Sequence, residues 1–325
     1  MKNIKWKKFL FLGLIVFAAF LFLYYFVGIG LNRPGKYFNK GENAVWLSHK
    51  WVGEKTTDQE VNDLVNQFKK YQISVVFVHA GPLDVDGTIP SDKYKYALSF
   101  LEKAKKYDDN IEYQAWIGQV RKEIDISDPK VQHNIAKQSL IFADLIGFDG
   151  IHFDIEPVWD GDENFIQALK IVRETIGDNK KISVALSEFI PQSLVWILED
   201  FKEFKNYNTE VNYKNVAEYA DQIIVMAYDT GLNSSFVYKW LVSQQTIWLT
   251  NLLKGKEVFI GIPAYDEAAP GFNPEVENIK NGLLGVISGL NNIRSDDKNF
   301  AGVAIYPYWK MTNEKWATYE DLWLK

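Results

Sequence analysis

Three ionisable side chains, His152, Asp154 and Glu156, alternate with apolar residues in the segment 150–157. A period of two is typical of a β-strand and places the three side chains on one face. The carboxyls of Asp154 and Glu156 are then neighbours, close enough for each to change the pKa of the other. Paired carboxyls of this kind can perform general acid catalysis. The alternative interpretation is an ion pair or a cap at the end of a strand.

Glu156 is the last polar residue of this predicted strand and the natural acid of the pair. Hydrolysis of a glycosidic bond needs a protonated acid at the leaving oxygen and a group that stabilises the developing oxocarbenium ion. An ionised Asp154 raises the pKa of Glu156 and keeps it protonated near neutral pH. His152 lies one layer lower, where its imidazole could donate a hydrogen bond to Asp154 or be a satisfied core residue.

The elements that must position these residues alternate between β-rich and amphipathic helical runs. Strands are predicted at 43–49, 73–80, 111–118, 150–156, 181–187, 222–228, 257–264 and 302–308. Helices are predicted at 57–71, 92–106, 129–146, 162–176, 193–205 with 213–220, 235–253, 274–293 and 313–323. Pro274 is expected in the first turn of its helix, where proline is tolerated. Eight βα units predict an α/β fold, a closed (β/α)8 TIM barrel with its chemistry at the carboxyl ends of the strands.

The fourth predicted strand resembles the signature of family 18 glycoside hydrolases (chitinases and N-acetylglucosaminidases), Asp-Gly-x-Asp-x-Asp-x-Glu. Asp149, Gly150, Asp154 and Glu156 match it, and His152 replaces the middle aspartate. Three further stretches resemble family motifs in the same order: Met226-Ala-Tyr228-Asp229, Gly261-Ile-Pro263-Ala-Tyr265, and Gly302-Val-Ala-Ile-Tyr306, where the family usually ends in tryptophan. Trp116-Ile-Gly118-Gln119 stands where the family usually has Ser-x-Gly-Gly. The chain resembles a divergent member or a sister family.

The resemblance implies a retaining, substrate-assisted mechanism, in which the acetamido carbonyl of an N-acetylhexosamine attacks its own anomeric carbon. It implies catalytic roles for Glu156 as the acid, for Asp154 in orienting the acetamido group, and for Tyr228 in hydrogen-bonding the forming oxazolinium. Asp149, with Gly150 and His152, is then a structural part of the motif. From the motifs and the aromatic residues at predicted strand ends, the substrate-binding candidates are Trp46, Trp116, Met226, Asp229, Tyr265, Tyr306 and Trp309. Aromatic faces stack on sugar rings, although any one of them can instead be core packing.

The amino terminus predicts a membrane anchor. Residues 1–8 carry four lysines and precede an apolar run, 9–31, that is long enough to span a bilayer as a helix. The lysines are expected to stay in the cytoplasm, which places the rest of the chain outside, on a single-pass membrane protein. The alternative is a cleaved signal peptide and a secreted enzyme, although no Ala-x-Ala site follows the run. Residues 32–42 are then a tether, and 43–325 the barrel.

Composition limits the partners. Without the four amino-terminal lysines, 32 basic residues stand against 42 acidic ones, a net charge of −10 that disfavours nucleic acid. The chain has no cysteine, so thiolate chemistry is excluded. His49, His79 and His152 come from three different strands without ligand spacing, so no metal is expected. No phosphate-binding loop is present, and neither a nucleotide nor another cofactor is expected.

Two alternatives to a membrane-anchored, substrate-assisted glycosidase remain open. A two-carboxylate retaining glycosidase would use Glu156 as the acid and Glu267, after the seventh strand, as the nucleophile. A saccharide-binding barrel without catalysis would keep the aromatic surface but lose turnover. In each case the partner is a polysaccharide.

Overall fold

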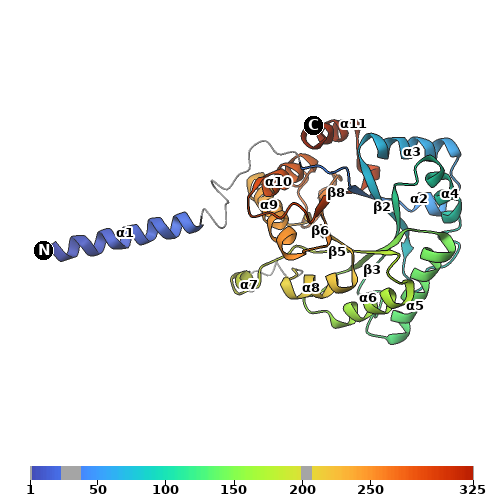
Figure 1. Cartoon of the computed structure of the whole chain (residues 1–325), viewed down its shortest axis with the longest axis horizontal. Helices are drawn as coiled ribbons and strands as arrows, with labels where there is room; N and C mark the ends of the chain where they lie inside the picture. The colour runs from blue at the N-terminus through green and yellow to red at the C-terminus, as the bar shows by residue number, and fades with distance from the viewer. Residues whose placement is uncertain (1, 23–37, 199–206, 325) are drawn as a thin grey trace.

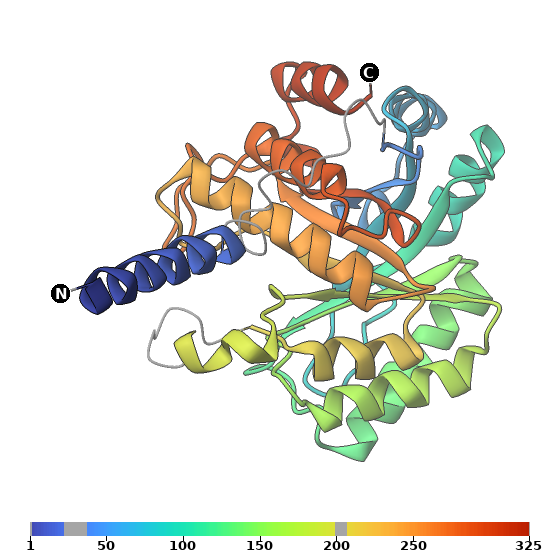
Figure 2. The ribbon, with the colours of Figure 1, turned by 60° about the vertical axis from the view of Figure 1, so that its left-hand side comes forward.

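The computed structural model describes residues 2–22, 38–198 and 207–324, and at its centre is a closed ring of eight parallel strands. Each strand pairs with the next in sequence, and the last pairs with the first. The strands are β1 (Asn43–Leu47), β2 (Ile73–Pro82), β3 (Glu112–Val120), β4 (Gly150–Glu156), β5 (Lys181–Leu186), β6 (Gln222–Met226), β7 (Glu257–Pro263) and β8 (Phe300–Tyr306). Figures 1 and 2 show the helices that follow these strands packed around the outside of the ring. The predicted (β/α)8 barrel is confirmed.

Alternation of side chains along the strands builds two layers of core. In β1, Val45 and Leu47 face the surrounding helices, whereas Ala44 and Trp46 face the inside of the ring. The inner layer consists of Ala44, Trp46, Val75, Phe77, Trp116, Ala185, Ile224, Phe259, Ala301 and Ala304. Side chains therefore fill the barrel, and chemistry is left to its ends.

The helices agree in place with the predicted ones, with differences at their ends, except α2, which was not predicted. They are α2 (Lys50–Gly53), α3 (Asp58–Lys70), α4 (Ala97–Tyr107), α5 (Pro129–Leu140) with a π-helical continuation (Ile141–Ile146), α6 (Glu163–Ile176), α7 (Gln192–Leu198), α8 (Glu210–Tyr219), α9 (Ser235–Leu252), α10 (Ile279–Asn291) and α11 (Asn313–Trp323), with a 3-10 turn at Tyr308–Lys310. Of the predicted helix 193–205, residues 199–205 lie outside the described residues.

The start of α10 corrects one prediction. The helix begins at Ile279, because the side chain of Asn278 caps it by accepting a hydrogen bond from the backbone N–H of Asn281. Pro274 is therefore not in its first turn but in the preceding loop. That loop carries Glu277, whose carboxylate accepts hydrogen bonds from the backbone N–H and the hydroxyl of Thr230.

The amino-terminal helix α1 spans Lys2–Phe22. Within the described part of the chain, no helix combines the length and the apolar character that crossing a membrane requires. Residues 23–31, the second part of the predicted anchor, are not among those described. The predicted tether, 32–42, is described from Phe38 onward, and there it already belongs to the barrel: Phe38 is buried in the outer core, and Asn39 donates a side-chain hydrogen bond to Gln72.

Candidate active site

Aromatic side chains join the predicted site residues at the carboxyl end of the barrel. Tyr306, the last residue of β8, lies at the centre of this group. Its ring stacks on that of Tyr228 with centroids 5.6 Å apart, and it meets the rings of Trp46, Trp116, Tyr265 and Trp309 at 5.7 to 6.3 Å. Trp309 is 46% exposed, so this aromatic group extends from the inside of the barrel to the surface.

Glu156 and Asp154 are electrostatically coupled on β4. Burial raises the pKa of Glu156, and the charge of Asp154, together with a hydrogen bond that the two carboxyls share, raises it further. Burial also raises the pKa of Asp154, while hydrogen bonds from Glu156 and Trp116 oppose that effect. Of the pair, Glu156 therefore holds the proton, which is the state required of a general acid near neutral pH.

Asp154 has one occupied and one open carboxyl oxygen. The indole N–H of Trp116 donates to Oδ2 over 2.9 Å. The other oxygen, Oδ1, is buried and accepts from no N–H among the described residues, so that Trp116 and the shared hydrogen bond with Glu156 are what hold this carboxyl. An unpartnered buried carboxylate oxygen beside a protonated acid is suited to accept a hydrogen bond from a bound ligand.

His152 does not reach Asp154, so of the two interpretations left open for it the structure supports the satisfied core residue. Its Nε2 accepts the indole N–H of Trp46 over 2.9 Å, and its Nδ1 lies 2.7 Å from the hydroxyl of Ser183. The imidazole also stacks on Phe77 at 3.9 Å and is fully buried, which lowers its pKa. His152 is thus a neutral, satisfied core histidine. Trp46, a predicted sugar contact, is only 1% exposed and packs in the inner core.

Tyr228 follows β6 and faces the two carboxyls. Burial, then the charge of Asp154, raises its pKa, so its hydroxyl keeps its proton and can donate. A methyl group at Gly261 on β7 would lie 3.2 Å from the Tyr228 ring and 2.8 Å from the backbone oxygen of Val225, so glycine there makes room for the tyrosine. Met226, at the end of β6, packs half-buried against the inner core.

Asp229 and Tyr265 form a neighbouring pair. The Tyr265 hydroxyl donates to Asp229 Oδ1 over 2.5 Å. Asp229 is exposed and has a left-handed backbone conformation, with φ of 60°. Both residues therefore offer polar groups at the barrel end where Glu156 lies.

Asp149 and Gly150 lie at the opposite, amino end of β4. The carboxylate of Asp149 accepts hydrogen bonds from Lys105 over 2.6 Å and from the backbone N–H of Tyr113 over 2.9 Å. A side chain at Gly150 would collide with the backbone of Lys181, 2.5 Å away. These motif residues hold β3, β4 and β5 together and do not face the acid.

Two further carboxyls near the site were not among the predicted site residues. Burial raises the pKa of both Glu188, after β5, and Glu277, before α10, to about 7. Glu188 and Asp229 in turn raise the pKa of Glu156 through their charge. The position of Glu188 at a strand end was a usable signal, whereas Glu277 fell inside a stretch predicted to be helical.

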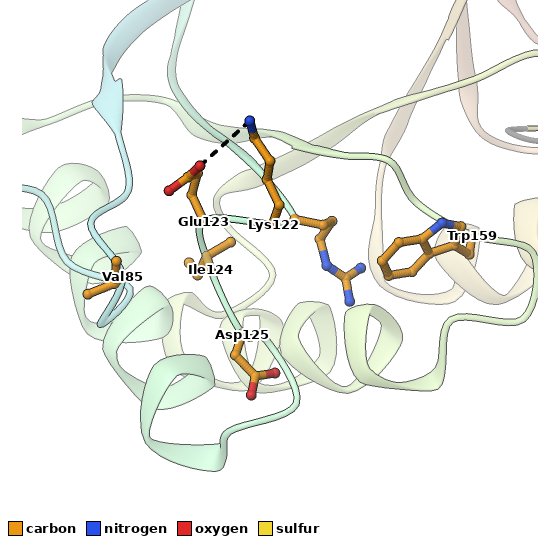
Figure 3. A pocket seen from close by; sticks show the side chains of 7 residues that line it. Val85, Lys122, Glu123, Ile124, Asp125 and Trp159 are labelled. Atoms are coloured by element: carbon orange, nitrogen blue, oxygen red, sulfur yellow. Dashed lines mark ion pairs between the residues drawn. The ribbon is translucent and has the colours of Figure 1, made fainter.

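A pocket of about 500 Å³ lies beside the site on the loops that follow β2, β3 and β4 (Figure 3). Its lining is Val85, Arg121, Lys122, Glu123, Ile124, Asp125 and Trp159. Trp159 is 46% exposed, and the Arg121 guanidinium lies 4.4 Å from its ring centroid. The backbone N–H of Arg121, which lines the pocket, donates to the carbonyl of Glu156, so the pocket lies next to the strand end that carries the acid. This pocket was not predicted from the sequence, although Trp159 is only three residues after Glu156.

Glu267 and the histidines lack the surroundings that their alternative roles would need. Glu267 is exposed and forms an ion pair with Lys310, which lowers its pKa. The rings of His49 and His79 are 5.6 Å apart, and burial lowers the pKa of His79 to about 4. In the part of the chain that is described, no three histidine or acidic side chains are grouped so that they could hold a metal ion.

The sequence and the fold are similar to those of known proteins. The sequence matches Glycosyl hydrolases family 18 over residues 50–323. Similar solved structures include the Bacillus megaterium spore cortex-lytic enzyme SleL, with a TM-score of 0.59 and 16% identity over 90% of this chain and 75% of that one. The Ostrinia furnacalis Group IV chitinase has a TM-score of 0.58 and 13% identity, over 87% of this chain and 100% of the other. A class V chitinase mutant from Cycas revoluta in complex with (GlcNAc)3 has a TM-score of 0.57 and 14% identity, over 87% and 99%. No curated protein matches the sequence.

Proposed function

The chain belongs to glycosyl hydrolase family 18 and is a glycoside hydrolase, and we propose that it cleaves β-linked N-acetylhexosamine polymers: peptidoglycan, a chitin-like chain or a surface glycan. The observation that carries this proposal is the buried carboxyl pair, with a protonated Glu156 beside an Asp154 that has one open oxygen. The structural similarity to chitinases and to a cortex-lytic enzyme is consistent with such a polymer.

We propose a retaining mechanism in which the substrate supplies the nucleophile. Glu156 gives its proton to the leaving glycosidic oxygen while the acetamido oxygen attacks the anomeric carbon and forms an oxazolinium ion. Asp154 Oδ1 accepts the acetamido N–H, and Tyr228 donates to the acetamido oxygen. Water then opens the oxazolinium, and the Glu156 carboxylate takes the proton of that water. Glu267, exposed and paired with Lys310, has no part in these steps.

The pocket at Trp159 extends this site along the polymer. We propose that a sugar ring stacks on the exposed face of the Trp159 indole, whose other face carries the Arg121 guanidinium. Trp159→Ala should then raise KM for long oligosaccharides while leaving short ones unchanged.

We also propose that the enzyme is anchored in the cell membrane with its barrel outside the cytoplasm. The support is in the sequence: Lys2, Lys5, Lys7 and Lys8 precede the apolar run 9–31. Protease added to intact protoplasts should remove the barrel and leave a small membrane-bound stub. Full protection would contradict the proposed orientation, and a released mature form would mean that the segment is cleaved.

Product analysis tests the activity itself. The purified protein is incubated with peptidoglycan, chitin oligosaccharides and a non-acetylated glucan, and the products are identified by mass. Cleavage of the acetylated polymers alone is the expected result. Cleavage of the glucan would favour a two-carboxylate mechanism, and binding without cleavage of any polymer would identify a non-catalytic barrel.

A further inference from the structure

Trp116 makes a contact that its position in the sequence does not suggest. It is the first residue of the β3 stretch that departs from the family pattern, and its side chain is only 8% exposed. Its indole N–H donates to Asp154 Oδ2 over 2.9 Å, although the residue paired with Asp154 in the β3–β4 register is Gly118. In the strand register Trp116 is paired with His152, so its indole extends toward the carboxyl end of the barrel to reach Asp154.

Gly118 leaves the space that this reach requires. A methyl group at position 118 would lie 3.3 Å from Trp116 Nε1 and 3.8 Å from the Cβ of Asp154. A larger side chain would crowd the indole and the backbone of Asp154, whose carbonyl oxygen would lie 3.1 Å from that methyl group. The pair Trp116 and Gly118 thus acts as a unit: one supplies the donor, and the other leaves the path open.

The directions of the neighbouring hydrogen bonds show that His152 cannot replace this donor. Trp46 donates to His152 Nε2, so the proton of the neutral imidazole is on Nδ1 and goes to Ser183, 2.7 Å away. The Ser183 hydroxyl then donates to the side-chain oxygen of Gln114 over 2.5 Å. Each proton of this chain is committed away from Asp154. Apart from the hydrogen bond shared with Glu156, the donor to the Asp154 carboxylate among the described side chains is Trp116.

We propose that Trp116 is a positioning residue of the reaction, which holds Asp154 with Oδ2 fixed and Oδ1 turned toward the substrate. This inference rests on the proposed function, because Asp154 Oδ1 is assigned there to the acetamido N–H. With no second carboxyl beneath it, Asp154 has no partner toward which to rotate. It keeps a single orientation through the reaction, and the one proton of the pair remains with Glu156 until the leaving group takes it.

The test compares two indoles on neighbouring strands of the full-length protein. Trp116→Phe keeps an aromatic ring but removes the donor to Asp154, and Trp46→Phe removes the donor to His152 in the same way. Trp116→Phe should lower kcat about 10- to 100-fold, the range expected for the loss of one hydrogen bond to an ionised group, with KM changed less. Trp46→Phe should have the smaller effect on kcat.

The pH profile provides a measurement that a packing defect would not move. Asp154 must be ionised, so activity is lost as pH falls through its pKa. The titratable groups that face Asp154 are Glu156 on β4, Tyr228 after β6 and Tyr306 on β8. Loss of the Trp116 donor raises the pKa of Asp154, so the acidic limb of kcat should move to higher pH in Trp116→Phe and stay in place in Trp46→Phe. An unmoved limb and an unchanged kcat in Trp116→Phe would overturn the proposal.

Two further measurements keep the test decisive if Trp116→Phe does not fold. Benzothienylalanine at position 116 keeps the shape of the indole without its N–H, and it should reproduce the same loss. The indole N–H resonance of Trp116 should move in the Asp154→Asn protein while that of Trp46 stays. This resonance separates the two ideas: a wild type that cleaves nothing refutes the proposed function, whereas an unmoved Trp116 resonance refutes the positioning role.

Discussion

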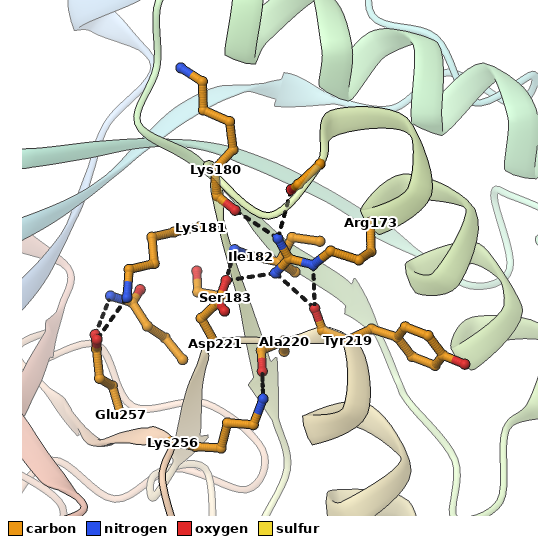
Figure 4. A network of polar contacts seen from close by, with 12 residues as sticks. Arg173, Lys180, Lys181, Ile182, Ser183, Tyr219, Ala220, Asp221, Lys256 and Glu257 are labelled. Atoms are coloured by element: carbon orange, nitrogen blue, oxygen red, sulfur yellow. Dashed lines mark hydrogen bonds and ion pairs between the residues drawn. The ribbon is translucent and has the colours of Figure 1, made fainter.

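The two ends of the barrel differ in how their ionisable side chains are paired. At the amino end, two ion pairs connect the loops: the Arg173 guanidinium binds Asp221 over 2.6 Å and the carbonyls of Gly177, Lys180 and Tyr219, and Lys181 binds Glu257 over 2.8 Å (Figure 4). Glu112 is the exception at this end, because burial raises its pKa to about 7. At the carboxyl end, the five carboxyls of the site form no ion pair with a lysine or arginine of the described residues: Asp154, Glu156, Glu188, Asp229 and Glu277. Ion pairs at that end involve carboxyls around the site, among them Asp162, Asp266 and Glu267.

The ion pairs at the amino end stabilise the fold, whereas the carboxyls without ion pairs at the carboxyl end serve the chemistry. Paired and hydrogen-bonded charges connect the loops that enter β5, β6 and β7 at the amino end. Unpaired, half-buried carboxyls oppose folding at neutral pH, and they persist because their mutual repulsion keeps Glu156 protonated. Substitutions at the two ends should therefore have opposite consequences for activity and stability.

The largest expected effect comes from the acid itself. Glu156→Gln keeps the size of the side chain but cannot deliver a proton, so kcat should fall by about 10² to 10⁴. The melting temperature should stay equal or rise, because a buried ionisable group is lost. Glu267→Gln is the matched control at an exposed position and should retain wild-type turnover. Equal losses in both variants would transfer the nucleophile role to Glu267.

The amino end should respond in the opposite sense. Arg173→Met removes five hydrogen bonds and leaves Asp221 without its ion pair, so the free energy of unfolding should fall by roughly 2–3 kcal/mol, less than for a fully buried pair. Denaturant unfolding measures this loss. The kcat of the folded fraction should match wild type, and a large drop in kcat would mean that the two ends are not independent.

A smaller effect is expected on the alkaline side of the pH profile. Glu156 must be protonated, so activity is lost as pH rises through its pKa, which Asp154, Asp229 and Glu188 all raise. Glu188→Gln removes one of these charges, and the alkaline limb of kcat/KM should move down by a few tenths of a pH unit. An unmoved limb would show that Glu188 carries no charge beside the acid.

The smallest effect concerns stability at the carboxyl end. The pKa of Glu188 is about 7 in the folded protein, against an ordinary value of 4.5. Below pH 4.5 the carboxyl is protonated in both states and does not oppose folding. As pH rises from 4.5 to about 7, the folded protein loses stability, because the unfolded chain releases this proton more easily. Glu188→Gln should therefore raise the melting temperature at pH 8 by about 1–3 °C and leave it unchanged at pH 4. An equal change at both pH values would point to packing and not to charge.

The barrel and the carboxyl pair could be predicted from the sequence, because both depend on local patterns. Alternation over residues 150–156 predicted that Asp154 and Glu156 share a face, and eight such segments predicted the closed ring. Helix ends were less predictable: Asn278, a better cap than Pro274, sets the start of α10.

The partners of the central residues could not be predicted in the same way. Whether Trp116 reaches Asp154, or Trp46 reaches His152, depends on the stagger between strands and on which neighbours are small, and no local pattern records either. Phe38 likewise looked like part of a tether, because its contacts come from the distant outer core.

Inhibition by an oxazoline-mimicking thiazoline tests the central claim most directly. If the acetamido group of the substrate is the nucleophile, the thiazoline should inhibit the wild type competitively, and Asp154→Asn and Tyr228→Phe should each weaken its binding while Glu267→Gln does not. A wild-type enzyme that cleaves acetylated glycans but ignores the thiazoline, with Glu267→Gln inactive, would contradict substrate assistance.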